Sequence, residues 1–103
     1  MFLVTGATGD LGSRIAWQIT EREMPVRAFV RLNSRYSELE YRGAEIFIGD
    51  LRRDKDIKKA CKDVKYIIST HSDSRNPQAI DYAANVDLID AAKECGVEHF
   101  VFI

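Results

Sequence analysis

The feature that most constrains the fold is a glycine triplet that follows a short apolar run near the start of the sequence. The run covers residues 2–4, and the glycines are Gly6, Gly9 and Gly12. Beyond the turn, apolar side chains recur at four-residue steps, at Leu11, Ile15 and Ile19. This spacing predicts an amphipathic helix. A strand, a glycine turn and a helix in this order are the context that a dinucleotide-binding loop requires.

Each glycine has a separate role in such a loop. The first lets the chain leave the strand in a tight turn, the second lets the backbone approach a pyrophosphate, and the third lets the helix pack close to the sheet. Free N–H groups and the positive end of the helix dipole then face the phosphates. The expected pyrophosphate-binding residues are Gly6, Ala7, Thr8, Gly9, Asp10, Leu11 and Gly12.

The remainder of the sequence alternates short apolar runs with amphipathic segments. Strands are expected at 2–5, 26–30, 46–48, 66–69 and 100–103, and helices at 11–23, 36–42, 56–62 and 78–94. The apolar runs are continuous, as in strands that are buried on both faces. The alternation predicts an α/β fold: a Rossmann-type, doubly wound parallel sheet in the order 3-2-1-4-5, with helices on both faces.

Local signals refine the two later helices. Asp54 is expected to cap the third helix, and Asn76 with Pro77 to open the fourth, which Gly96 would end. The apolar stripes of these helices are Ile57, Ala60 and Cys61 in the third, and Ile80, Ala84, Leu88, Ala92 and Cys95 in the fourth. Both cysteines therefore fall on apolar sides. Neither belongs to a CxxC pair, so buried free thiols are favoured over a disulfide.

Composition excludes several classes of protein. The 103 residues suit one domain, 1–103, and 46% hydrophobic with 30% charged residues is ordinary for a soluble globular protein. A net charge of −1 gives no general attraction to nucleic acid or acidic membranes. The basic run at 52–62 is interleaved with aspartates and is interpreted as a solvated helix face. With a strand expected from residue 2 and no long apolar run, we expect no signal peptide, no membrane span and a cytoplasmic protein.

Two residues near the ends of the second and third strands are candidate contacts for the adenosine half of a dinucleotide. Arg31 suits a 2′-phosphate, whereas an acidic residue would suit the ribose hydroxyls of NAD. Asn33, Ser34 and Arg35 on the same loop add donors. Asp50 can accept a hydrogen bond from the adenine amine, with Leu51 beside it. The alternatives are a solvated arginine at Arg31 and a turn-capping aspartate at Asp50.

The fourth strand ends in Ser69 and Thr70, followed by His71 and a polar loop. Loops at the carboxyl ends of strands form the binding crevice of open α/β sheets. Ser69 and Thr70 are therefore expected beside the nicotinamide ribose or the pyrophosphate. A lone histidine on a loop is more often solvated than catalytic, so no role is assigned to His71.

Several segments together resemble the NmrA-like branch of the extended and atypical short-chain dehydrogenase/reductases. They are residues 5–12 (TGATGDLG), 26–31 (VRAFVR), 43–51 (GAEIFIGDL), 80–82 (IDY) and 88–97 (LIDAAKECGV). The resemblance implies a Rossmann domain that prefers NADP(H) over NAD(H), with Arg31 at the 2′-phosphate and Asp50 at the adenine. Asp81 falls where extended members carry an active-site asparagine, and its role stays open.

The resemblance also leaves two functions open. Catalytic members use a Tyr-x-x-x-Lys pair, and none of the four tyrosines of this sequence has a lysine four residues later. We therefore assign no catalytic residue and no metal ligand, and expect an amino-terminal portion of a larger oxidoreductase. The alternative is a non-catalytic NADP(H)-sensing or assembly-factor module, similar to relatives that assist photosystem II assembly, which would place it in a plastid stroma. The fifth strand would be an open edge, available for self-association.

Overall fold

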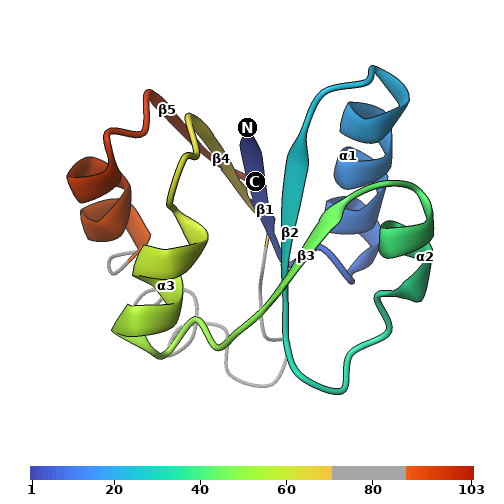
Figure 1. The fold of residues 1–103 in the computed structure, drawn as a ribbon, viewed down its shortest axis with the longest axis horizontal. Coiled ribbons are helices and arrows are strands. Elements are labelled where there is room, and N and C mark those ends of the chain that lie inside the picture. The colour runs from blue at the N-terminus through green and yellow to red at the C-terminus, as the bar shows by residue number, and fades with distance from the viewer. Residues whose placement is uncertain (71–87) are drawn as a thin grey trace.

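The computed structural model describes residues 1–70 and 88–103, and its centre is a five-stranded parallel sheet (Figure 1). The strands are β1 (Phe2–Thr5), β2 (Val26–Val30), β3 (Glu45–Ile48), β4 (Tyr66–Ser69) and β5 (His99–Phe102). Their order is β3-β2-β1-β4-β5, which confirms the predicted topology. Because β1 lies between β2 and β4, the direction of winding reverses at its carboxyl end.

Helices cover both faces of this sheet, as predicted. The named helices are α1 (Asp10–Glu21), α2 (Ser37–Tyr41) and α3 (Asp54–Ala60), and residues 88–95 are also helical. Figure 1 shows α1 and α2 on one side, with α3 and helix 88–95 on the other. Among the described residues, no helix is long and apolar enough to cross a membrane.

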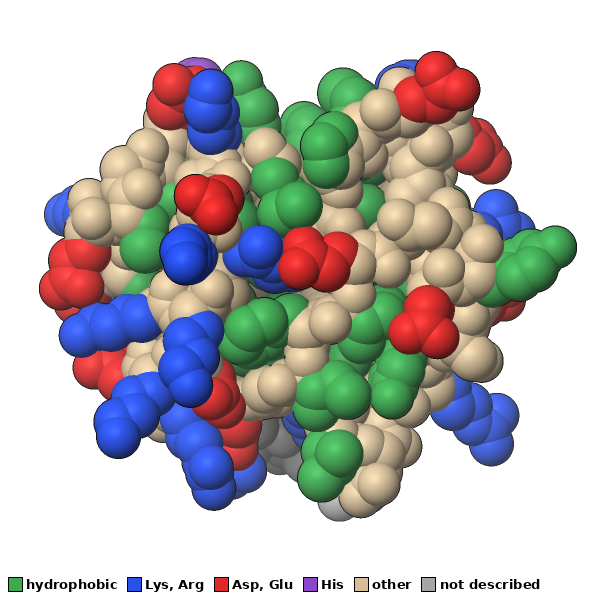
Figure 2. Space-filling model, in the orientation of Figure 1, with side chains coloured by type: hydrophobic (Ala, Val, Ile, Leu, Met, Phe, Trp, Pro, Cys, Tyr) green, Lys and Arg blue, Asp and Glu red, His purple; other side chains and the backbone are tan. Residues whose placement is uncertain are grey.

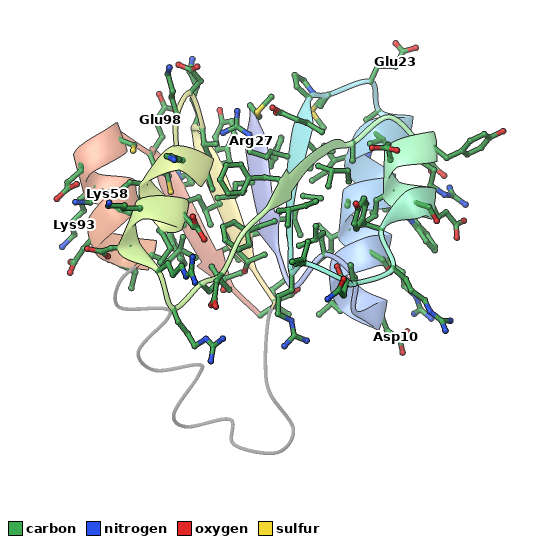
Figure 3. The ribbon with its side chains drawn as sticks, turned by 60° about the horizontal axis from the view of Figure 1, so that its bottom comes forward. Asp10, Glu23, Arg27, Lys58, Lys93 and Glu98 are labelled. Carbon is green, nitrogen blue, oxygen red and sulfur yellow. The ribbon has the colours of Figure 1, made fainter. Side chains whose placement is uncertain are left out.

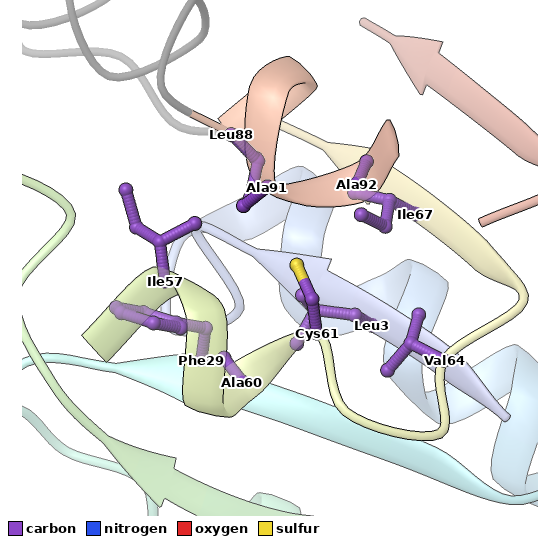
Figure 4. Packing of buried hydrophobic residues seen from close by; sticks show 10 residues of the cluster. All are labelled: Leu3, Phe29, Ile57, Ala60, Cys61, Val64, Ile67, Leu88, Ala91 and Ala92. Atoms are coloured by element: carbon purple, nitrogen blue, oxygen red, sulfur yellow. The ribbon is translucent and has the colours of Figure 1, made fainter. Parts of the chain in front are cut away.

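Each face has its own hydrophobic core. On the α1 side, Val4 and Ala28 of the sheet pack with Ala16 and Ile19 of α1 and with Leu39 of α2. On the other side lie the ten residues drawn in Figure 4: Leu3, Phe29, Ile57, Ala60, Cys61, Val64, Ile67, Leu88, Ala91 and Ala92. Alternate residues of a strand point to opposite faces, so the continuous apolar run of β1 serves both cores.

The register of the strands aligns their carboxyl ends. Thr5 of β1 pairs with Phe29 of β2 and with Ser69 of β4, and Phe29 pairs with Phe47 of β3. The loops that follow β1, β2, β3 and β4 therefore leave the sheet along one edge, the lower edge in Figure 1. This edge holds the site residues predicted from the sequence.

Several local predictions were wrong. Arg53, not Asp54, is the residue before α3, and no side chain caps that helix. Leu11 is exposed, because the buried face of α1 is formed by Gly12, Ala16 and Ile19. β3 is an outer strand, so its residues are exposed or only partly buried.

Cys95 is exposed at the end of helix 88–95, whereas Cys61 is fully buried as predicted, and both are free thiols. Gly96 ends this helix with a φ of 75°, as the sequence indicated. The predictions for Asn76, Pro77, Ile80 and Ala84 lie outside the described residues, as do those for His71 and Asp81.

Candidate functional site

The glycine segment after β1 forms a tight turn that leads directly into α1. Gly6 has a φ of 67°, a left-handed conformation that favours glycine. Its carbonyl accepts a hydrogen bond from the Gly9 N–H at 3.1 Å, which closes the turn. Ala7 is fully buried beneath the loop, whereas Thr8, Gly9, Asp10 and Leu11 are exposed. The turn therefore presents its backbone to solvent at the carboxyl edge of the sheet.

Helix α1 begins without a side-chain cap. Gly9 precedes it in an extended conformation (φ −78°, ψ 170°), and its carbonyl accepts the N–H of Ser13 at 2.9 Å. Within the described residues, no acceptor binds the N–H groups of Asp10, Leu11 or Gly12. Uncapped N–H groups and the helix dipole make this end of the helix suited to an anion. Asp10 lies in the same first turn, and Figure 3 shows its side chain directed away from the molecule.

Gly12 is the point of closest packing between α1 and the sheet. A Cβ atom at this position would clash with the Gly6 carbonyl and would lie 2.7 Å from the Thr70 Oγ1. Thr70 donates its hydroxyl to the Thr5 carbonyl at 2.7 Å, so it is held against the end of β1. Because only glycine fits here, the start of α1 is brought close to the end of β4 as well as β1.

The structure places the two predicted residues of β4 differently. Thr70 is partly buried beside the glycine turn. Ser69 is buried between β1 and β4, where its hydroxyl accepts a hydrogen bond from the Thr5 Oγ1 at 3.1 Å. Thr5 had no predicted polar role, and a hydroxyl at a strand end is too common in sequences to have revealed this pair.

Arg31 follows β2 directly and is exposed on the same edge. Its carbonyl is fixed by Ser34, whose N–H and hydroxyl donate to it at 3.1 and 2.6 Å, while Asn33 adopts a φ of 70°. Its guanidinium has no hydrogen-bond or ion-pair partner within residues 1–70 and 88–103. Arg35 is exposed on the same loop. The structure therefore leaves a free positive charge on the loop that follows β2, the strand next to β1.

Asp50, by contrast, is occupied within its own turn. Its carboxylate accepts the Arg52 N–H at 2.8 Å and a forked contact from the Arg52 guanidinium, with Nη2 to Oδ2 at 2.8 Å. The hydrogen bonds and charge of Arg52 lower the pKa of Asp50 below its usual value, against a smaller opposing effect of burial. Asp50 therefore caps its own turn, as the alternative interpretation predicted. Its carboxylate also lies on the carboxyl edge of the sheet, where the adenine contact was predicted.

A second aspartate organises the loop after β3 and was missed in the sequence. Asp56 Oδ2 accepts the N–H of Asp50 at 2.9 Å. The loop is also tied to its neighbour, since the Gly49 N–H donates to the Val30 carbonyl at 2.9 Å. Leu51 is partly buried and packs against the core that contains Ile57. An aspartate in the first turn of a helix is a common signal, so its spacing from Asp50 alone could not identify this bond.

The basic run begins at this edge, with Arg52 and Arg53 in the loop after β3, and continues along α3 to Lys62. Figure 2 shows a group of lysine and arginine side chains over this region. Arg52, Arg53, Lys55, Lys58, Lys59 and Lys62 are all exposed. The predicted solvated helix face is therefore correct. Across the described part of the chain, no three His, Cys, Asp or Glu side chains cluster in a way that could hold a metal ion.

Comparison with known protein families identifies this glycine turn and sheet as a cofactor-binding fold. A family model described as NAD(P)H-binding matches residues 6–103, nearly the entire chain. The chain belongs to this NAD(P)H-binding family. The resemblance to NmrA-like reductases is confirmed by relatives of the same type.

These relatives include reductases and an assembly factor. An NAD(P)H azoreductase from Xenophilus azovorans is 36% identical over 98% of this chain and 34% of its own length. The photosystem II assembly factor Ycf39 of Trieres chinensis is 33% identical over 97% of this chain and 33% of its own. A Citrobacter triphenylmethane reductase, solved with NADP(H), superposes with a TM-score of 0.81 at 27% identity, over 99% of this chain and 36% of its own. The NAD(P)H-binding chain therefore spans about a third of each.

Proposed function

We propose that residues 1–103 form the NADP(H)-binding domain of a reductase, with the dinucleotide lying across the carboxyl edge of the sheet. The observation that carries this proposal is the uncapped start of α1. Its free N–H groups follow a turn in which Gly9 exposes backbone and Gly12 admits no side chain. A pyrophosphate bound here would accept these N–H groups and interact favourably with the helix dipole.

The remaining contacts follow from the order of the loops along the edge. The pyrophosphate lies on the turn from Gly6 to Gly12, which includes Ala7, Thr8, Asp10 and Leu11. From there the adenosine half extends over β2 and β3, so that Arg31 and Arg35 meet the 2′-phosphate, and Asp50 and Leu51 meet the adenine. The nicotinamide half extends over β4, beside Thr70 and the nearby Ser69. The neighbouring positions of β3, β2, β1 and β4 support this path.

The preference for NADP(H) over NAD(H) is carried by Arg31. Its free guanidinium can make two parallel, charge-assisted hydrogen bonds to a phosphate. An acidic side chain at this position would instead accept hydrogen bonds from the ribose hydroxyls of NAD(H). The fixed carbonyl of Arg31 holds the backbone from which the side chain reaches the ligand.

The experiment is a pair of fluorescence titrations with NADPH and NADH on the 103-residue chain and on Arg31→Asp. We expect tighter binding of NADPH to the native chain and an abolished or reversed preference in the variant. Arg22→Asp, at the far end of α1, is a control with the same change of charge. Equal affinities of the native chain for the two dinucleotides would contradict the role of Arg31, and no binding of either would contradict the site.

A second candidate function is a non-catalytic module that binds NADP(H) and acts through protein contacts, either in the cytoplasm or in a plastid stroma. The similarity to the assembly factor Ycf39 over 97% of this chain favours it. The test uses the complete gene product, with NADPH oxidation measured in the presence of an azo dye. Turnover that depends on the dye supports the reductase. NADPH binding without turnover, together with an NADPH-dependent protein complex, supports the second candidate.

A further inference from the structure

Two cysteines meet between α3 and helix 88–95, at the opposite end of these helices from the dinucleotide edge. Cys61 follows α3 directly and is fully buried, and Figure 4 shows its sulfur directed toward the helix that carries Ala91 and Ala92. Cys95 lies one turn beyond these alanines, and its thiol donates to the Lys58 carbonyl of α3 at 3.9 Å. The two thiols therefore share one helix contact.

Their environments give the two thiols different reactivity. Burial raises the pKa of the Cys61 thiol to about 12, the neighbouring Cys95 thiol adds to the rise, and Arg27 opposes it. Cys61 is therefore protonated and shielded from solvent at neutral pH. Cys95 is exposed, so an external reagent reaches its sulfur first. Because thiolates are the nucleophiles in disulfide exchange, the exposed cysteine is the one positioned to attack.

Cys95 also opens onto a basic groove. The groove is shallow and open to solvent, and it is lined by Lys58, Lys59, Lys62, Asp63 and Cys95. Lys58 pairs with Glu94 at 3.8 Å. Of the lysines that line the groove, Lys59 and Lys62 therefore have no ion-pair partner within the described residues. Figure 3 shows Lys58 on α3 and Lys93 on helix 88–95, the two helices between which the cysteines lie. This groove complements a small anionic molecule.

We propose that Cys95 exchanges with an anionic, low-molecular-weight disulfide such as glutathione disulfide, and that Cys61 resolves the adduct into a reversible Cys61–Cys95 disulfide. This site is distinct from the dinucleotide edge. Both cysteines lie at the contact between the two helices, outside the sheet.

The chemistry is a balanced pair of exchanges. The Cys95 thiolate attacks one sulfur of glutathione disulfide, the S–S bond breaks, and one glutathione thiolate leaves and takes up a proton. The sulfur of Cys61 then attacks the Cys95 sulfur of the mixed disulfide, and the Cys61 proton passes to the departing glutathione sulfur. The Cys61–Cys95 bond forms and the second glutathione leaves. Two electrons pass from the cysteine sulfurs to the oxidant, which becomes two thiols.

The bond would link α3, which begins just after the Asp50 loop, to the helix that precedes β5. A crosslink between segments distant in sequence restricts the unfolded chain, so the oxidised protein is expected to melt at a higher temperature. Reduction would return the protein to its original melting temperature.

The test is incubation of the 103-residue chain with glutathione disulfide, followed by intact mass measurement and peptide mapping. We expect the loss of two hydrogens and a Cys61–Cys95 peptide, reversed by dithiothreitol. Cys61→Ala removes the resolving thiol and should accumulate one glutathione adduct on Cys95, and Cys95→Ser should remain unmodified. A native chain that keeps both thiols, or that stops at the same adduct as Cys61→Ala, would overturn the proposal.

A second comparison tests the groove itself. Lys59→Gln with Lys62→Gln removes two positive charges without touching either cysteine. We expect slower reaction with glutathione disulfide and an unchanged rate with the neutral hydroxyethyl disulfide. The matched control is Lys55→Gln, an exposed lysine of α3 outside the groove lining. Equal slowing with both oxidants, or with neither, would exclude recognition of charge by the groove.

Discussion

The loop after β1 and the loops after β2 and β3 build the same edge by different means. The first is defined by its backbone: a left-handed Gly6, an uncapped helix start and a Gly12 that tolerates no Cβ. The others present charged side chains, a free Arg31 and an Asp50 that is held by Arg52. The backbone part is therefore rigid, whereas the side-chain part can change without altering the fold.

This difference separates two properties of the site. Backbone N–H groups bind any pyrophosphate, so they support dinucleotide binding in general. Side chains at the ends of β2 and β3 distinguish one dinucleotide from another, because they meet the groups in which the dinucleotides differ. Variants of the first loop should therefore affect all dinucleotides, and variants of the others should change selectivity.

The largest effect is expected for Gly12→Ala. The added methyl group clashes with the Gly6 carbonyl and the Thr70 hydroxyl, so we expect a loss of about 1–3 kcal/mol of unfolding free energy and of all dinucleotide binding. Urea unfolding and NADPH titration measure the two effects. Unchanged stability would mean that α1 packs less closely than described.

Gly9→Ala is the matched variant in the same turn. Its Cβ would lie 3.4 Å from the Gly6 oxygen, an ordinary contact, and its backbone angles suit any residue. We therefore expect native stability, with NADPH and NADH affinities both reduced about 10-fold or more by the methyl group in the path of the pyrophosphate. A change of selectivity without loss of affinity would contradict the division between the loops.

Arg31→Gln should change selectivity instead. Charge-assisted hydrogen bonds contribute about 1.5–3 kcal/mol, so NADPH affinity should fall about 10- to 150-fold while NADH affinity is nearly unchanged. Parallel titrations of Arg35→Gln show how the phosphate contact is shared between the two arginines. Raising the salt concentration should weaken the remaining preference. An equal loss for both dinucleotides would assign Arg31 to the pyrophosphate.

Thr70→Val tests the contact between the glycine turn and the end of β4. The variant loses the hydroxyl bond to the Thr5 carbonyl at about constant volume, which should cost about 1 kcal/mol of unfolding free energy. We expect a smaller loss of NADPH affinity than for Arg31→Gln, because the glycine turn loses one support. Thermal unfolding and titration measure both. Thr20→Val, whose hydroxyl bonds within α1, is the control.

The smallest effect is expected for Arg52→Gln. Without Arg52, the pKa of Asp50 should rise toward its ordinary value, as an NMR titration of the carboxyl would measure. A lowered native pKa contributes stability above about pH 4, and this contribution is lost as the pH falls through the native value. The native chain should therefore exceed the variant slightly in stability at neutral pH, and the two should converge in acid. A growing difference in acid would contradict the assignment.

The sheet was predictable because its signals are local. Each buried strand is a short continuous apolar run, and β1, β2 and β4 were predicted with the bounds that the structure has. The glycine triplet was also predictable, because Gly6 needs a left-handed backbone and Gly12 leaves no room for a side chain. Glycine is the residue type that meets both requirements. The topology followed from the handedness of parallel crossovers.

The residues whose roles or burial were predicted wrongly are those whose environment depends on contacts with other elements. Asp54 has the composition of a helix cap, yet the chain enters α3 through Arg53, and Asp56 binds the preceding loop. Leu11 has helical spacing, but α1 turns its glycine toward the sheet. Cys95 continues an apolar stripe that reaches solvent in the last turn of its helix. Periodicity predicts which face of a helix is apolar. How far along the helix that face stays buried depends on the length of the element that packs against it.

The sequence by itself determined the parallel sheet, the glycine turn and the charged residues that follow the strands, since each depends on the conformation or polarity of nearby residues. Only the tertiary structure decided that the Arg31 guanidinium is free while Asp50 is held, and that Cys61 and Cys95 share one contact. Pairings of this kind join segments distant in the chain. Their partners are selected when the strands and helices pack, because packing brings the side chains within reach of one another.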